Sequence, residues 1–240
     1  MNLVLLPGMM CDQRVWAEQR RALESDGHQI LCGDLSGAQS ILALAQGILS
    51  QCPARFALAG LSMGGIVAFE MWRLAPLRIT HLALLDTNPH AELPERQAQR
   101  AGEIAAVRQG GLRELVVGSL KPRYFGSLQR DNAALRELVT IMALQLGATV
   151  FERQATALRD RCDSTATLAT INVPTLVLCG KEDELCPPHY HQLMAERIAL
   201  ADLVVLAESG HLPTLERPDA TTLELRRWLA RNAQARYGQQ

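Results

Sequence analysis

The chain has 240 residues, enough to bury a full hydrophobic core, and its length suits one α/β domain that carries an insertion. Its formal net charge is −1 with 20% charged residues, so neither a basic nucleic-acid-binding surface nor a charged disordered tail is expected. The longest apolar runs are too short to span a bilayer, and the first of them lacks the flanks of a signal peptide, so we expect no membrane association.

Six short segments are predicted β-strands. Each is apolar almost throughout, which is typical of strands buried on both faces of a parallel sheet. They cover residues 2–7, 28–34, 55–60, 81–86, 174–180 and 201–208.

Segments with helical periodicity alternate with these strands. We expect helices at about residues 13–26, 40–51, 64–75, 188–199 and 219–232. Strand and helix alternation with right-handed crossovers predicts a doubly wound, essentially parallel α/β sheet.

The segment from residue 89 to about residue 165 departs from this alternation. It contains only helix-like stretches, 93–109, 111–120, 129–146 and 148–160, and it leaves from the carboxyl end of a strand, where open α/β sheets bind ligands. We therefore predict a helical lid over 89–165 inserted into a core domain of residues 1–88 and 166–240. The alternative is a set of core helices that fill one side of the sheet.

The sequence AGLSMGGIVAFE, residues 59–70, places Ser62 between a predicted strand and a predicted helix. Gly60 and Gly64 lie two residues before and two residues after it, as a very tight turn with a strained serine requires. The helix that follows would direct free N–H groups at the same point. The pattern indicates a nucleophilic serine, whereas an ordinary turn between a strand and a helix is the simpler alternative.

A serine hydroxyl needs a base, and His211 is the preferred candidate among six histidines. It follows the last predicted strand in SGHLPTLERP, at the carboxyl edge of the sheet, with His90 as a distant second choice. His189 and His191 begin a predicted helix and are expected to be exposed.

Asp183 is the preferred acid because it lies three residues beyond the glycine that ends its strand. Asp86, at the end of another strand, is a credible substitute, although binding of backbone N–H groups is its simpler role. The order Ser62, Asp183, His211 is the order associated with α/β-hydrolases.

At this point the chain resembles an α/β-hydrolase of the small serine esterase and enol-lactonase type over nearly its whole length. LLPGMMCDQRVW resembles the loop after the first strand of that family, and GDLSGAQS resembles the loop after the next one. VPTLVLCGKEDELCPP and AESGHLPTLERPD resemble the acid and histidine segments.

The resemblance implies an oxyanion hole formed by the backbone N–H groups of Met9 and Met63. It also implies a sheet of about six strands, because the N-terminal hairpin of the family is missing. The implied reaction is hydrolysis of a small carboxylic ester or lactone through an acyl-enzyme, without a cofactor. Pro7 replaces the usual histidine, and Leu61 replaces the asparagine of many C–C bond hydrolases.

The substrate itself is not evident from the sequence. The side chains that could line an apolar pocket are Met10, Met63, Phe125, Met142, Leu146 and Leu212, although ordinary core packing is the simpler role for each. The predicted lid carries eleven Lys or Arg and nine Asp or Glu, so its charge does not predict a strong preference for an anionic substrate. A C–C hydrolase or perhydrolase with the same triad, or a non-catalytic ligand-binding protein, are the alternative functions. The oligomeric state is left open.

The six cysteines show no CxxC spacing, which favours reduced thiols in a cytoplasmic protein. A metal site could be imagined at Cys186, His189 and His191. The two histidines are two residues apart at a helix start and would not share a face, so we interpret them as turn and surface residues and expect no metal.

Overall fold

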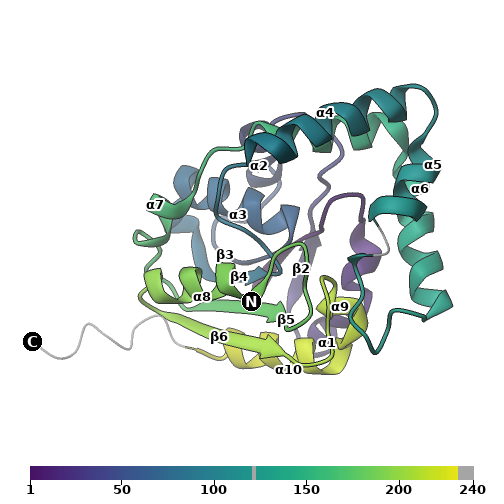
Figure 1. The fold of residues 1–240 in the computed structure, drawn as a ribbon. Helices are drawn as coiled ribbons and strands as arrows, with labels where there is room; N and C mark the ends of the chain where they lie inside the picture. Colours follow the sequence, from purple (N-terminus) through teal and green to yellow (C-terminus); the bar gives the residue numbers. More distant parts are fainter. Residues whose placement is uncertain (121–122, 232–240) are drawn as a thin grey trace, which may run out of the picture.

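The computed structural model describes residues 1–120 and 123–231 and has a six-stranded sheet at its centre (Figure 1). The strands are β1 (Asn2–Leu6), β2 (Gln29–Cys32), β3 (Phe56–Leu61), β4 (Ile79–Leu85), β5 (Thr175–Gly180) and β6 (Ala201–Leu206). All neighbouring pairs are parallel, in the order β2-β1-β3-β4-β5-β6. This confirms the predicted doubly wound, six-stranded α/β fold.

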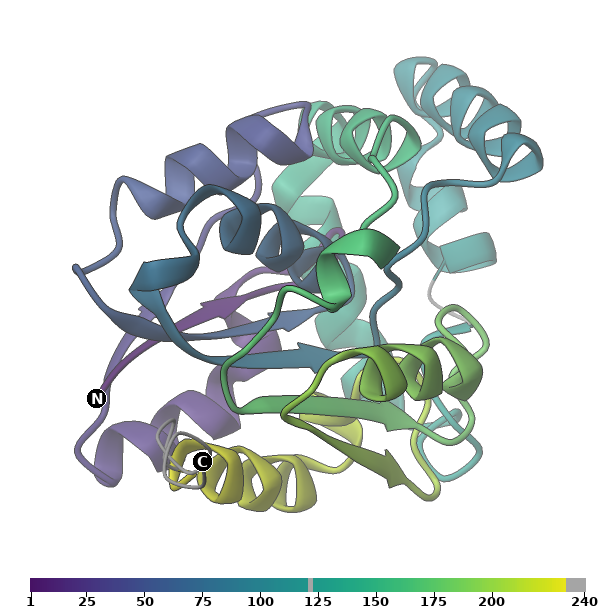
Figure 2. The ribbon, with the colours of Figure 1, turned by 90° about the vertical axis from the view of Figure 1, so that its left-hand side faces the viewer.

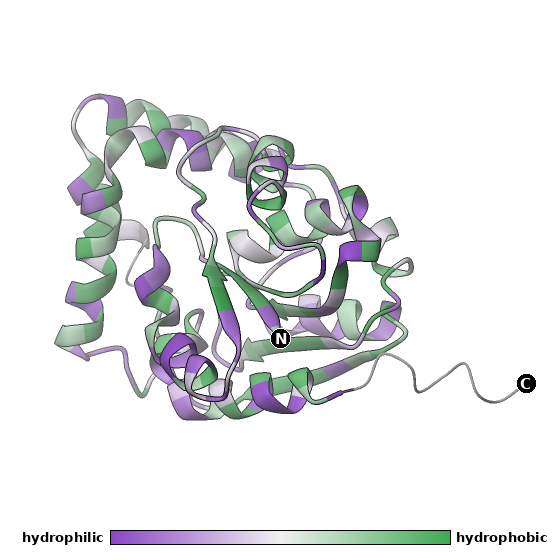
Figure 3. Cartoon of the chain, turned by 180° about the vertical axis from the view of Figure 1, so that it is seen from behind, coloured by the Kyte–Doolittle hydropathy of each residue, from purple (hydrophilic) through white to green (hydrophobic). Residues whose placement is uncertain are grey.

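Helices cover both faces of the sheet, as Figure 2 shows. One face is packed by α2 (Ile41–Leu49), α3 (Met63–Leu74) and α8 (Pro188–Arg197), and the other by α1 (Ala17–Ser25) and α10 (Pro218–Leu229). Alternate side chains of β1 explain the two layers, since Val4 and Leu6 join one hydrophobic cluster whereas Leu3 and Leu5 join the other. In Figure 3 the central strands are largely hydrophobic and the surrounding helices alternate between hydrophobic and hydrophilic residues.

Most predicted elements lie within a few residues of the observed ones. The predicted helix 13–26 is a 3₁₀ turn, Gln13–Trp16, followed by α1, and residue 232 of the predicted helix 219–232 lies outside the described residues. The sequence predicted that all six strands are buried on both faces. This is correct for β1, β3, β4 and β5 and wrong for β2 and β6. These two strands form the edges of the sheet, so Leu203 and Val205 of β6 are partly exposed.

The segment between β4 and β5 is helical throughout its regular parts. It contains α4 (Pro94–Arg108), α5 (Leu112–Leu115), a π-helical turn (Val116–Leu120), α6 (Ala133–Arg159) and α7 (Thr165–Leu168). Figure 1 shows α4, α5 and α6 projecting beyond the sheet. The segment also joins the core, because Leu158 packs in one cluster beside the sheet and Phe125 in the other.

By length and composition alone, helix α6 is long and apolar enough to cross a membrane. Its most apolar stretch of 18 residues has a mean hydropathy of 1.4, and 22% of that stretch is buried. Gly147 interrupts it with the non-helical backbone angles φ 81° and ψ 177°. Each straight half is therefore shorter than the roughly 20 residues that a membrane span requires.

Candidate active site

Ser62 occupies the turn between β3 and α3. Its φ of 53° and ψ of −114° lie in a region that non-glycine residues rarely adopt, as the sequence predicted. Its backbone N–H donates a hydrogen bond to the Leu85 carbonyl at 2.8 Å, which fixes the turn against β4. A hypothetical Cβ on Gly60 would lie 2.4 Å from the Gly64 carbonyl, and one on Gly64 would lie 2.5 Å from the Leu6 carbonyl oxygen. These close approaches explain why both flanking positions are glycine.

His211 lies in the loop after β6 and reaches Ser62. Its Nε2 is 2.9 Å from Ser62 Oγ, and its Nδ1 is 2.8 Å from Asp183 Oδ2. The backbone N–H of His211 donates to the Tyr124 carbonyl at 2.8 Å, so the segment between β4 and β5 also holds this loop. The His211 and Asp183 side chains are almost completely buried.

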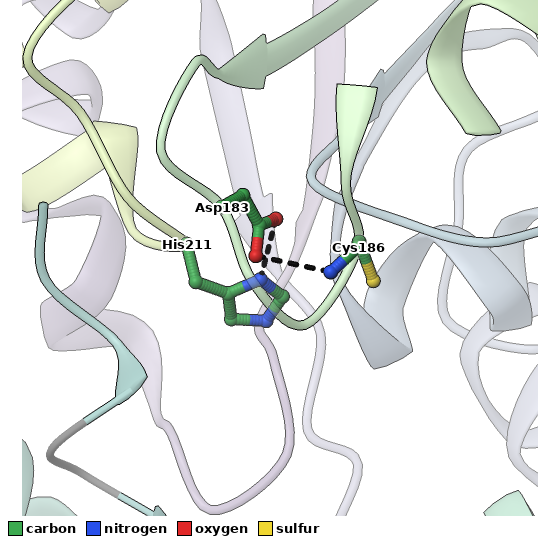
Figure 4. Close-up of side chains that lie close together, drawn as sticks. All are labelled: Asp183, Cys186 and His211. Atoms are coloured by element: carbon green, nitrogen blue, oxygen red, sulfur yellow. Dashed lines mark hydrogen bonds and ion pairs between the residues drawn. The ribbon is translucent and has the colours of Figure 1, made fainter. Parts of the chain in front are cut away.

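Asp183 comes from the loop after β5, and Figure 4 shows how its two oxygens are used. Oδ2 faces the His211 ring, while Oδ1 accepts the N–H groups of Leu185 and Cys186 at 2.8 and 3.0 Å. Burial opposes ionisation, but His211 and then the Cys186 N–H outweigh it and lower the pKa of Asp183 to about 2. An ionised carboxylate can only accept, so Nδ1 of His211 is the donor and Nε2 is left to accept the Ser62 hydroxyl proton.

The predicted alternatives have other partners. Asp86 Oδ1 accepts the Gly180 N–H at 2.9 Å, which confirms its predicted binding of a backbone N–H. Burial, and then the nearby Asp183 carboxylate, raise the pKa of Asp86 well above its ordinary value. His90 lies beside Asp163, with 3.6 Å between Nδ1 and Oδ2. Within the described residues, His211 is the histidine whose ring bonds Ser62 Oγ.

The prediction that His191 is exposed is wrong. Its side chain is completely buried, and its Nε2 accepts the Thr87 N–H at 3.0 Å. Burial lowers the pKa of His191 to about 4, so its ring is neutral near pH 7. Helix α8 packs one face onto the sheet, and His191 is on that face. Its position near the start of the predicted helix did not reveal which face of the helix is buried.

The three donors Asp183, Cys186 and His211 lie within 4.8 Å of one another (Figure 4). This group differs from the Cys186, His189 and His191 set considered from the sequence. Burial, and then the adjacent carboxylates, raise the pKa of the Cys186 thiol well above its ordinary value. Metal binding requires the thiolate, which this environment disfavours.

Glu216 was not predicted from the sequence and organises the loop that carries His211. Its buried carboxylate accepts the backbone N–H groups of Gly126 at 2.7 Å, of Gly210 at 3.0 Å and of Leu212 at 3.0 Å. Gly210 and Leu212 flank His211 on both sides. No local sequence motif predicts these hydrogen bonds of Glu216, because they depend on how the folded chain places the carboxylate.

Met9 and Met63 both border the cavity above Ser62. Met63 is the first residue of α3, where a helix leaves N–H groups unpaired. Gly8 brings the Met9 segment close, because a hypothetical Cβ on Gly8 would lie 3.9 Å from Ser62 Oγ. In the described part of the chain neither amide donates to a protein acceptor.

The cavity has a volume of about 780 Å³ and includes Ser62, Met63 and His211 in its wall. The lining differs from the predicted pocket. Of the predicted side chains only Met63 borders it, while the others pack within hydrophobic clusters beside the cavity: Met10, Phe125, Met142, Leu146 and Leu212. Their apolar spacing reflected core packing, the simpler of the two roles considered.

A sheet of this topology with a serine turn and an adjacent histidine defines the class of α/β hydrolases. The model of the alpha/beta hydrolase family matches residues 3–224, so the chain belongs to that family.

Several of the similar proteins are described as esterases, and one solved structure of the same fold is described as an enol-lactonase. The chain is 30% identical to a thermophilic esterase from Thermogutta terrifontis, whose structure was solved with malate bound, with a TM-score of 0.89 and coverage of 95% of this chain and 89% of the other. It is 24% identical to the enol-lactonase from Burkholderia xenovorans LB400, with a TM-score of 0.86 and coverage of 96% and 90%.

A third relative is similar in sequence. The chain is 25% identical over 237 residues to the pimeloyl-[acyl-carrier protein] methyl ester esterase of Legionella pneumophila (strain Corby), covering 91% of both chains. Together these relatives fit the prediction of a carboxylic-ester hydrolase.

Proposed function

We propose that this protein hydrolyses a small carboxylic ester or lactone through an acyl-enzyme, with Ser62 as nucleophile, His211 as base and Asp183 as acid. The observation that carries the proposal is the continuous hydrogen-bond chain from Asp183 Oδ2 through the His211 ring to Ser62 Oγ. The relatives named above support an ester or lactone as the substrate.

Each atom in this chain has a role in acyl transfer. Nε2 of His211 takes the hydroxyl proton as Ser62 Oγ bonds to the carbonyl carbon, and Asp183 stabilises the imidazolium that results. The C–O bond then breaks, and Nε2 gives its proton to the leaving alcohol. Water repeats the sequence on the acyl-serine, and the acid product and free Ser62 are released.

The Met9 and Met63 amides are proposed to hold the oxyanion that forms on the carbonyl. Both residues border the cavity beside Ser62, and in the described part of the chain neither backbone N–H donates to a protein acceptor. One such donor contributes about 3 kcal/mol to transition-state stabilisation.

We further propose that residues 89–165 act as a lid over a core formed by 1–88 and 166–240. More than half of the residues that line the cavity come from this segment, including Arg96, Arg100 and Tyr124. A cytoplasmic location is proposed as well, because the six cysteines show no CxxC spacing, which favours reduced thiols of the kind usual in a reducing compartment.

The test compares the wild type with Ser62→Ala on p-nitrophenyl esters of short acids. Loss of the nucleophile is expected to reduce kcat/KM by at least about a thousandfold. Ser50→Ala, at an exposed site after α2, is the matched control and is expected to keep the wild-type rate. A fluorophosphonate probe should label the wild type at Ser62 and should not label Ser62→Ala.

Three outcomes would contradict the proposal. Equal ester hydrolysis by the wild type and Ser62→Ala would remove Ser62 as nucleophile. Failure of the wild type on all esters and lactones, together with turnover of a vinylogous diketone, would favour the C–C hydrolase alternative. Failure of the probe to label the wild type would favour a ligand-binding protein.

A further inference from the structure

The cavity above Ser62 carries more positive than negative charge. Among residues 1–120 and 123–231 its charged lining, apart from histidine, consists of four arginines and two glutamates: Arg96, Arg100, Arg123, Arg161, Glu92 and Glu103. Arg96 and Glu103 neutralise each other, with 2.6 Å between Nη1 and Oε1. The excess of positive charge therefore arises from the remaining four side chains.

Glu92 is shared between two buried arginines. Its Oε2 lies 2.6 Å from Arg100 Nε and 2.8 Å from Arg161 Nη1, and each of the three side chains is at most 10% exposed. Burial opposes ionisation of Glu92, yet the two guanidinium groups hold its pKa below the ordinary value. One negative charge thus faces two positive charges, and a buried charge without a full counter-charge is costly.

The two arginines differ in how much of their hydrogen-bonding capacity is used. Arg161 also donates to the carbonyl groups of His90 at 2.9 Å and Leu158 at 3.0 Å. Arg100 makes its remaining contact from Nη1 to Met9 Sδ at 3.7 Å, and a thioether is a weak acceptor. In the described chain Nη2 of Arg100 has no hydrogen-bond acceptor, although a guanidinium offers five N–H donors.

The geometry points to a substrate that carries a carboxylate, which Arg100 binds inside the cavity. This inference rests on the proposed function and names the substrate class of the same site. A carboxylate would supply the missing negative charge and could accept two parallel N–H bonds from the guanidinium. Arg123, also in the lining, adds a further positive charge that attracts anions towards the cavity.

The position of Arg100 also limits the size of the substrate. Its guanidinium contacts the side chain of Met9, whose own amide is a proposed oxyanion donor. The carboxylate and the scissile carbonyl would therefore bind on opposite sides of one residue. A compact ester or lactone with a short spacer between the two groups fits this arrangement.

The experiment measures a preference, defined as the kcat/KM of a charged ester divided by that of a neutral ester of similar size. For a carboxylate on the acyl side, the p-nitrophenyl hemiester of glutaric acid is compared with p-nitrophenyl pentanoate. For a carboxylate on the alcohol side, the butanoyl ester of hydroxyacetic acid is compared with its methyl ester. We expect the wild type to prefer the charged ester in at least one pair.

Arg100→Met should reduce that preference by about tenfold to hundredfold, the usual loss for one hydrogen bond to a charged group. Arg100→Lys keeps the charge without the planar fork and should give an intermediate preference. The matched control is Arg108→Met on the same helix, because Arg108 pairs with Glu152 at the surface and does not border the cavity. This control should keep the wild-type preference.

A measurement on the wild type alone covers the case in which the Arg100 variants do not fold. Glutarate should inhibit hydrolysis of the neutral ester more strongly than pentanoate, which lacks the second carboxylate, and added KCl should reduce the difference. Hydrolysis of neutral esters without preference for either charged ester would overturn the inference and leave the proposed function intact. An unchanged preference in folded Arg100→Met would overturn the assignment to Arg100. Neutral-ester hydrolysis that survives in Ser62→Ala would instead contradict the proposed function.

Discussion

Glu216 holds the loop that carries His211, the proposed base of the site. Its two carboxylate oxygens accept N–H groups from both neighbours of His211 and from Gly126, so one side chain ties the last loop to the segment between β4 and β5. The carboxylate does not contact Ser62 Oγ in the described structure, so we regard Glu216 as a positioning residue.

Glu216→Gln should therefore reduce kcat more than it raises KM. The glutamine amide nitrogen would replace one acceptor oxygen by a donor that faces backbone N–H groups, which leaves buried donors unpaired and costs about 1–3 kcal/mol of stability. We expect about a tenfold or larger fall in kcat at a temperature where the variant is folded, measured by steady-state kinetics and circular dichroism. Glu208→Gln, at an exposed position two residues before Gly210, is the control, and an equal effect there would contradict the role of Glu216.

At the residue scale the sequence predicted the serine, acid and base positions that the structure brings together, because each lies next to a strand end in a recognisable pattern. The close approaches at Gly60 and Gly64 have a local cause that the spacing of glycines reveals. The cavity lining was not predictable in this way. Arg100 belongs to a charged helix, and only the tertiary structure shows that it is buried beside Glu92 and Met9.

At the scale of elements, Gly147 shapes the largest helix of the segment between β4 and β5. The sequence predicted separate helices at 129–146 and 148–160, and α6 is indeed interrupted between them by the one non-helical residue Gly147. The apolar periodicity located the two halves correctly. The predicted boundary is also correct, because one glycine with φ of 81° redirects the chain there without a loop.

Gly147→Ala should destabilise the protein by about 1–3 kcal/mol, because φ of 81° with ψ of 177° is a conformation that essentially only glycine adopts. Gly102→Ala is the matched control, since Gly102 lies within α4 and a Cβ there would meet nothing within 4 Å. That change should stabilise the protein by about 0.5–1 kcal/mol. Denaturant unfolding measures both, and stabilisation by Gly147→Ala would show that the break in α6 is not required.

At the scale of the whole molecule, the sheet sets which side chains share an edge. Six apolar segments and their intervening helices were enough to predict the parallel topology, since right-handed crossovers leave few alternatives. Which strands lie at the edges was not evident from hydropathy alone, because β6 is as apolar as the central strands although its outer side chains are partly exposed.

Asp86 should make global stability depend on pH. Its folded-state pKa is raised, so between an unfolded-state pKa of about 3.9 and the folded value the native state holds a proton that the unfolded state has lost. In that window stability falls as pH rises. Asp86→Asn keeps an oxygen for the Gly180 N–H and does not titrate. As the pH rises from about 4 to about 7, the unfolding free energy of this variant should therefore increase by at least about 1 kcal/mol relative to that of the wild type.

Urea unfolding of both proteins across this range measures the effect. Asp131→Asn, at an exposed site before α6, serves as the control and should run parallel to the wild type. Curves of Asp86→Asn and wild type that stay parallel would contradict a raised pKa for Asp86.

The Ser62 to His211 hydrogen bond joins residues 149 positions apart, and His211 follows the last strand of the sheet. During synthesis Ser62, the proposed nucleophile, leaves the ribosome long before its proposed proton acceptor His211 is made. A nascent chain would therefore be inert towards activated acyl compounds in its surroundings, and reactivity would arise only when the final loop docks. Acylation of Ser62 would thus report completed folding, and it would spare intermediates from premature modification.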